Sequence, residues 1–170
     1  MKKRILVAYA SRSGSTAETA DMIAHELSLQ KGITAEAASV KNAKDIASYD
    51  AIILGTAIHM GRPLPEMLSF VKSYQPILAT KKVASFGMCM SLIKETPQTL
   101  KESDAYLATL NAQCKPFESR VFAGNVNLSK LKFMSRMIVK MVKSPVGDFR
   151  KLDDIKMWAR ETGKKLIVSE

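Results

Sequence analysis

Cysteine and histidine are scarce in this sequence, and their scarcity excludes several kinds of site. The two cysteines, Cys89 and Cys114, are too few for a disulfide framework and are not spaced as metal ligands. We therefore expect a protein without a metal centre in a reducing compartment, and the cytoplasm is the simplest one.

Long apolar runs are also missing. No stretch reaches the roughly 20 residues that a membrane-spanning helix needs, and we expect no secretory signal. Lys2, Lys3 and Arg4 precede apolar residues, but that run breaks at Ser11 and is typical of a first strand. With 170 residues, the chain is long enough for one domain, residues 1–170, with its own core.

Acidic residues are outnumbered, since 16 Asp and Glu face 26 Lys and Arg and leave a net charge of +10. Such an excess favours an anionic partner, which could be a nucleic acid, an anionic membrane surface or an acidic small molecule. Aromatic residues are few and are not interleaved with the basic ones, and no nucleic-acid-binding motif occurs. We therefore expect no nucleic acid as a partner.

A loop rich in hydroxyl groups is the most informative stretch that is present. It follows the apolar residues 5–10 and precedes a helical pattern. A buried strand, a tight loop and a helix start form an arrangement that binds phosphate, because the first amide groups of a helix have no intrahelical partner. Its glycine lets the backbone approach a ligand closely. The loop consists of Ser11, Arg12, Ser13, Gly14, Ser15 and Thr16.

The loop matches neither of the common nucleotide-binding patterns. Gly14 is its only glycine, which excludes GxGxxG, and it has no lysine, which excludes GxxxxGK[ST]. No cysteine precedes it, so a phosphatase with a cysteine nucleophile is excluded as well. A cradle for a single terminal phosphate remains. The alternative is an ordinary helix cap by Ser13 or Ser15, and the loop alone does not separate the two.

Apolar strands alternate with helical patterns along the rest of the chain. We predict strands near residues 5–10, 33–40, 51–54, 82–86 and 117–123, and helices near 16–31, 64–74, 97–113 and 153–167, with a basic amphipathic stretch at 129–143. This alternation predicts an α/β fold, a doubly wound parallel sheet of five strands with helices on both faces.

Ligands of such sheets bind at the carboxyl ends of the strands, so the loops after the first, third and fourth strands should meet. The second loop, residues 55–63, and the third, residues 87–91, are apolar and rich in small residues. Loops of this kind suit a flat aromatic ring system. A phosphate cradle beside them fits FMN, and this convergence favours the phosphate-binding interpretation of residues 11–16.

The chain resembles the flavodoxin-like family. The first-loop pattern of that family, a hydroxyl residue followed by x-[ST]-G-x-T, is matched by residues 11–16 in a strand–loop–helix setting. The resemblance covers nearly the whole chain and implies that FMN binds with its phosphate at Ser11 to Thr16. The isoalloxazine ring would lie between the second and third loops, at Thr56, Ala57, Ile58, His59, Met60, Gly61, Gly87, Met88, Cys89, Met90 and Ser91.

More narrowly, the chain looks like the menaquinone-dependent protoporphyrinogen oxidase branch. The similarity lies in residues 49–50, 55–61, 96–99 and 123–124 and in the basic stretch 133–143. That branch carries an inserted segment after the fifth strand, which would correspond here to about residues 127–151. The resemblance implies a porphyrinogen as an anionic substrate and a quinone as electron acceptor, with redox chemistry by the flavin and no catalytic side chain.

Two features depart from the electron-carrier flavodoxins. Carriers usually place an aromatic residue against the flavin from each of the second and third loops, and neither tip here has Trp, Tyr or Phe. Carriers are also commonly acidic. Both departures favour the oxidase branch, although a carrier that passes electrons between redox proteins stays open as the alternative.

Individual residues also have two interpretations. His59 could stack on the ring or donate a proton, or it could be an exposed loop histidine. Arg62 could hold an anionic substrate or lie on the surface. The stretch 129–143 has basic and methionine-rich faces, which suit peripheral contact with the inner face of a membrane, a substrate surface or ordinary helix packing.

Overall fold

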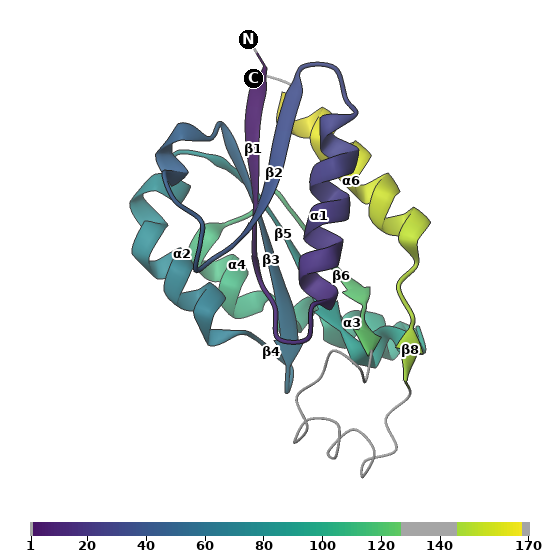
Figure 1. Ribbon diagram of the computed structural model, residues 1–170. Helices are drawn as coiled ribbons and strands as arrows, with labels where there is room; N and C mark the ends of the chain where they lie inside the picture. Colours follow the sequence, from purple (N-terminus) through teal and green to yellow (C-terminus); the bar gives the residue numbers. More distant parts are fainter. Residues whose placement is uncertain (1, 127–145, 168–170) are drawn as a thin grey trace.

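A parallel sheet lies at the centre of the computed structural model, which describes residues 2–126 and 146–167 (Figure 1). In these residues the parallel strands follow the order β2, β1, β3, β5, β6. The chain therefore adds β2 on one side of β1 and β3, β5 and β6 on the other. The strands are β1 (Lys3–Ala10), β2 (Ile33–Ser39), β3 (Ala51–His59), β5 (Lys82–Cys89) and β6 (Glu118–Ala123).

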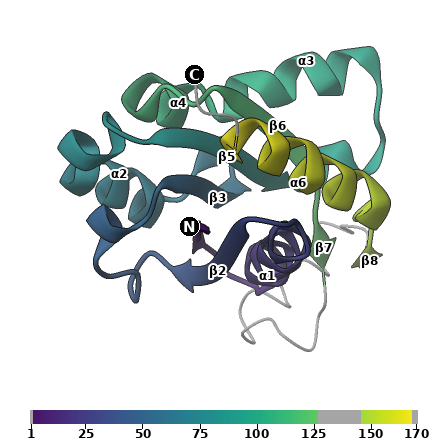
Figure 2. The ribbon, with the colours of Figure 1, turned by 90° about the horizontal axis from the view of Figure 1, so that it is seen from above.

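Helices cover both faces of the sheet (Figures 1 and 2). On one face lie α1 (Ser15–Ser28) and α6 (Leu152–Ile167), and on the other lie α2 (Pro65–Leu78) and α4 (Ala108–Cys114). The helix α3 (Pro97–Tyr106) lies near the carboxyl end of β6, after the short 3-10 turn η2 (Met90–Ile93). The predicted doubly wound α/β fold is confirmed. No helix in the described ranges is long and apolar enough to cross a membrane.

The core consists of two apolar layers, one on each face of the sheet. Between the sheet and α1 and α6, the Trp158 ring lies edge-on to Phe86 and Phe122, with centroids 6.1 and 5.7 Å away. The second layer joins β1 and β3 to α2 and α4 through residues such as Leu54 and Val71. Burial on both faces explains why the central strands are continuous apolar runs rather than alternating ones.

The strands β3 and β5 extend further than the sequence indicates, into the predicted second and third loops. Residues 55–59 continue β3, which turns at Met60 and Gly61 and pairs back with β4 (Arg62–Pro63). Met60 and Gly61 both have positive φ, 51° and 74°, as the two-residue hairpin turns that match strand twist require. The glycine and proline signals therefore mark a hairpin tip rather than a long loop.

The predicted helix 97–113 is two helices, because the chain breaks between α3 and α4 at Leu107. No glycine or proline occurs there, so the sequence carries no signal for the break. Leu107 is buried in the second apolar layer at this point. The basic stretch 129–143 lies outside the described residues, as does most of the predicted insertion 127–151. At its end, β8 (Gly147–Asp148) pairs with β7 (Asn125–Val126) in a two-stranded ribbon.

The close packing of Gly55 against Phe86 gives a test of the core. A Cβ atom at Gly55 would overlap the Phe86 ring, which in turn contacts Trp158. We expect Gly55→Ala to lower the free energy of unfolding by about 1–3 kcal/mol, because overpacking displaces the ring. Urea denaturation followed by Trp158 fluorescence measures the change. Ser69→Ala on the exposed side of α2 is the control, and equal stability of the two variants would contradict this packing.

The Cys114 thiol is buried at the end of α4 and donates to the Leu110 carbonyl oxygen over 3.3 Å. Burial raises its pKa to about 11. In a Cys89→Ser variant, we expect iodoacetamide at pH 8 to label native Cys114 at least about 100-fold more slowly than the urea-unfolded chain, because the thiolate is the reactive form. Mass spectrometry against time measures both rates. Similar rates in the two states would show that the thiol is not held as the structure has it.

Candidate functional site

The carboxyl ends of three neighbouring strands meet at one edge of the sheet, at the bottom of Figure 1. In the strand register, Ala10 of β1 lies beside Thr56 of β3, and Thr56 lies beside Gly87 of β5. The structure thus brings together the segments that follow these residues. The edge includes the position between β1 and β3, where the order in which strands are added to the sheet reverses. Ligands of doubly wound sheets bind at this position.

The loop at residues 11–14 leads into α1 without a side-chain cap. Gly14 is the N-cap residue, with φ 93° and ψ −18°, and none of the described side chains caps the helix. Ser11 Oγ instead accepts a hydrogen bond from the Gly14 amide at 3.1 Å and so shapes the loop. The alternative of a cap by Ser13 or Ser15 is therefore wrong. The first-turn amide groups remain for a ligand.

The other loop hydroxyls have different surroundings. Ser15 Oγ accepts a hydrogen bond from the Asn125 amide at 3.1 Å, which ties the helix start to β7. Thr16 is buried, Ser13 is half-buried and Arg12 is exposed. Sequence reasoning missed Asn125, because a contact between residues 110 positions apart leaves no local signal.

The second segment, around the β3–β4 hairpin, has a buried base and an exposed tip. Thr56 is fully buried, and its hydroxyl accepts from the Leu64 amide and donates to the Ala57 carbonyl oxygen, each over 3.0 Å. Ala57 and Ile58 are half-buried. His59, Met60 and Gly61 are exposed, and 91% of Met60 is accessible. An apolar side chain therefore projects from the tip.

The side chains of the third segment, residues 87–91, are mostly buried. Gly87, Met88 and Cys89 are buried within β5, and Met88 belongs to the first apolar layer. Cys89 Sγ lies 3.0 Å from Ser91 Oγ, while Met90 is half-buried and Ser91 is exposed. A ligand at this edge would therefore meet the backbone, Met90 and Ser91 rather than Met88 or Cys89.

Gly87 is needed for the contact between the second and third segments. A Cβ atom at this position would lie 3.2 Å from Ile58 Cγ1 and 3.3 Å from Leu107 Cδ2. The absent side chain lets Ile58 pack directly over β5. The two segments are thus held against each other as one wall of the edge.

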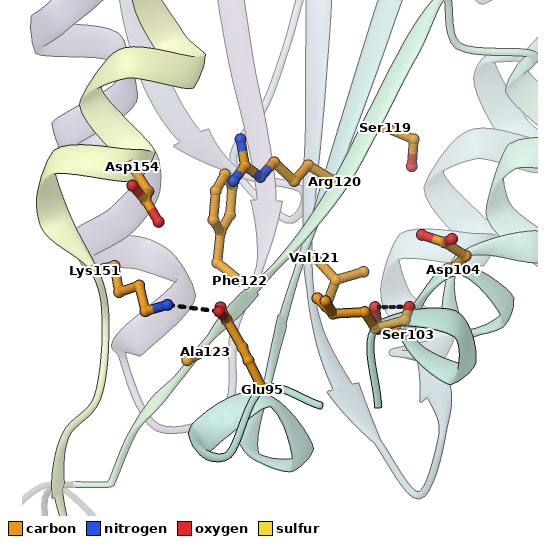
Figure 3. Close-up of a pocket in the computed structure, with 11 residues that line it drawn as sticks. Glu95, Ser103, Asp104, Ser119, Arg120, Val121, Phe122, Ala123, Lys151 and Asp154 are labelled. Carbon is orange, nitrogen blue, oxygen red and sulfur yellow. Dashed lines mark hydrogen bonds and ion pairs between the residues drawn. The ribbon is translucent and has the colours of Figure 1, made fainter. Parts of the chain in front are cut away.

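A cavity of about 220 Å³ lies elsewhere, along the outer edge of β6 between α3 and the start of α6 (Figure 3). It shares no residue with the three segments above. Lys151 Nζ and Glu95 Oε2 form an ion pair across it at 2.6 Å, and the Arg120 guanidinium lies over the Phe122 ring. The convergence of loops at the carboxyl edge is the stronger indication of a cofactor site, because uncapped amides point to a ligand and this mixed-charge groove does not.

Comparison with known proteins points to one family. The sequence profile of the flavodoxin domain matches residues 6–153. The protoporphyrinogen IX dehydrogenase [quinone] of Escherichia coli K12 is 26% identical over 149 residues, which cover 85% of this chain and 81% of that protein. The Leishmania major protein of the same name is 22% identical over 155 residues, or 85% of this chain and 64% of that protein.

Solved structures agree on the fold. Oxidised flavodoxin 1 from Bacillus cereus superposes with a TM-score of 0.62 at 20% identity, covering 98% of this chain and all of that one. Fusobacterium nucleatum flavodoxin bound to flavin mononucleotide gives 0.59 at 16% identity, with 96% and 99% covered. With the profile match over most of its length, the chain belongs to the flavodoxin domain family.

Proposed function

We propose that the chain binds FMN at the carboxyl edge and passes electrons from a reduced porphyrinogen to a quinone. The uncapped start of α1 at Gly14 is the observation that carries the cofactor assignment, because a helix of 14 residues presents free amides and its positive end to an anion. The family match makes FMN the expected ligand. The names of the curated relatives supply the substrate and the acceptor.

The residues at the edge fit FMN. The first-turn amides with Ser13 and Thr16 would hold the phosphate, while Ser11 shapes the loop and Ser15 anchors it. The β3–β4 hairpin and Met90 to Ser91 would border the ring. When bound, FMN supplies the transfer of one or two electrons. The protein would position the flavin and set the electrostatic environment around it. No described side chain at this edge is arranged as a nucleophile.

The hairpin tip suits an apolar substrate with acidic groups. Met60 is almost fully exposed, and its flexible side chain adapts to flat apolar surfaces. His59 and Arg62 are both exposed and are paired in the hairpin register, so they flank the tip. Arg62 would hold a carboxylate through paired donors, and His59 would donate or accept a proton. A porphyrinogen, an apolar macrocycle with propionates, has this combination.

The electron carrier remains the second candidate, since the solved neighbours include flavodoxins of nearly the same extent. The non-aromatic tips argue against it. In an electron carrier, the basic surface residues would select acidic protein partners through salt-dependent association. Membrane contact by the basic stretch 129–143 stays a prediction, as does a cytoplasmic location.

The phosphate cradle is tested by comparing two glycines with similar backbone. Gly14 has φ 93° and Gly32 has φ 89°, but Gly32 lies at the opposite edge of the sheet, before β2. Gly14→Ala should weaken FMN binding by about tenfold or more, because strain displaces the first-turn amides. Gly32→Ala should lower stability without changing FMN affinity. Titration of apoprotein by FMN fluorescence quenching measures both, and equal affinities would refute the cradle.

The reaction is tested by anaerobic mixing of the FMN-loaded protein with protoporphyrinogen IX and a menaquinone analogue. We expect porphyrin fluorescence to rise only when both FMN and the quinone are present. Gly14→Ala apoprotein with substoichiometric FMN is the control for dependence on the cofactor. A flavin-loaded protein that gives no turnover but exchanges electrons with reduced ferredoxin would favour the carrier.

Arg62 is tested through the same assay. Arg62→Gln should raise the KM for protoporphyrinogen IX by about tenfold with less effect on kcat, because a carboxylate contact is lost in both ground and transition states. Lys72→Gln, an exposed cation on α2, is the matched control for lost surface charge. An unchanged KM in Arg62→Gln would remove this residue from the substrate site.

A further inference from the structure

An arginine bridge lies against the first turn of α1. Arg150 follows β8, and its Nε and Nη2 atoms donate to the two carboxylate oxygens of Asp148 over 2.8 and 2.6 Å. The same Nη2 lies 3.1 Å from Glu18 Oε2 in that first turn. Only 7% of the Arg150 side chain is exposed. A buried guanidinium thus connects the ribbon to the helix that begins at Ser15.

One nitrogen of this guanidinium, with two N–H donors, is left over. Arg150 Nη1 is buried and has no hydrogen-bond partner among the residues that the structure describes. A buried donor without an acceptor costs free energy, and more so when it is charged. The hydrogen bonds from Arg150 also hold the pKa of Asp148 below its usual range, so the pair stays ionised. The unused donor indicates that an acceptor arrives with a ligand or with its bound water.

The ribbon that carries Arg150 is fixed to the helix start at a second point. The Asn125 amide donates to Ser15 Oγ, and Asn125 lies opposite Asp148 in the ribbon register. The Phe149 amide donates to the Gly124 carbonyl oxygen over 3.2 Å. Arg150 is therefore held at this turn by the fold and not only by its own ion pairs.

The acidic residue in this turn presents an electrostatic problem for an anionic ligand. Glu18 stabilises the helix by its position near the positive end, but its carboxylate repels a phosphate dianion at the same end. Asp148 adds a second negative charge nearby. Without a cation beside them, these carboxylates would weaken the preference of the first turn for a phosphorylated ligand over a neutral one.

We infer that Arg150 is a positioning residue that offsets these carboxylates and makes the start of α1 selective for a phosphorylated flavin. The inference rests on the proposed FMN site and adds a residue that the loop motif does not contain. Arg150 acts through Glu18, Asp148 and its spare donor, and it need not touch the phosphate.

A matched bridge on the same helix provides the control. Near the other end of α1, Arg160 Nε donates to Glu26 Oε2 over 2.9 Å. Like Arg150→Gln, Arg160→Gln removes one cation that pairs with a carboxylate of α1, although 58% of the Arg160 side chain is exposed and only 7% of the Arg150 side chain is. The two variants differ in their distance from the phosphate loop, so their comparison separates a local effect on the ligand from a general effect on the helix.

The experiment titrates each apoprotein with FMN and with riboflavin, which lacks the phosphate, and follows flavin fluorescence. We expect Arg150→Gln to weaken the binding of FMN by about tenfold and that of riboflavin by less than about twofold. Arg160→Gln should leave the ratio of the two affinities unchanged. Arg150→Lys should keep most of the FMN preference, and Glu18→Gln added to Arg150→Gln should restore part of it.

Each outcome supports or overturns either the role of Arg150 or the proposed cofactor site. An unchanged ratio in Arg150→Gln, or the same loss of ratio in Arg160→Gln, would overturn the role of Arg150. Trp158 fluorescence shows whether Arg150→Gln folds. If it does not, the ratio of the FMN and riboflavin affinities in Arg150→Lys and in Glu18→Gln alone still tests the inference. Glu18→Gln should then strengthen the binding of FMN but not that of riboflavin. A wild-type protein that binds neither flavin would instead refute the proposed cofactor site.

Discussion

The burial of β1 and β3 on both faces is the constraint on which the rest of the structure depends. Side chains of these strands enter both apolar layers, so neither strand can leave the centre of the sheet. Parallel strands need crossovers, and α1 therefore returns the chain over one face while α2 returns it over the other. The helix α1 must begin beside the end of β1, where its free amides face the edge. The position of the candidate binding edge thus follows from the burial of the central strands.

The sequence predicts those parts of the site that are encoded locally. The hydroxyl-rich loop and Gly14 indicate a helix start that binds phosphate, and the apolar runs indicate the strands that place it. The sequence does not predict the hairpin at Met60, because a glycine and a proline are equally compatible with a loop. It does not predict the break at Leu107 either, since the neighbouring residues favour a helix and tertiary packing decides the geometry.

Contacts between segments that are far apart in the sequence cannot be predicted from local sequence patterns. Ser15 is a natural cap by its residue type, yet its hydroxyl accepts from Asn125. Arg150 looks like one more basic residue in a chain with a net charge of +10, and yet it is nearly buried against Glu18. In both cases, the role of the side chain depends on which surface the ribbon covers. A local motif shows where a phosphate could bind but not which distant residues adjust its affinity.

In the proposed site, a strongly basic chain would hold its cofactor mainly through neutral donors. The loop itself has one cation, Arg12, which is exposed, and its remaining donors are amides and hydroxyls. An exposed cation is screened by salt, whereas amides fixed by the fold require no reorganisation to receive an anion. If Arg150 balances the carboxylates of the first turn as we infer, selectivity for a phosphate would depend on geometry rather than on the total positive charge. Under the proposed function, the excess of surface cations would then remain for the recognition of a substrate or partner.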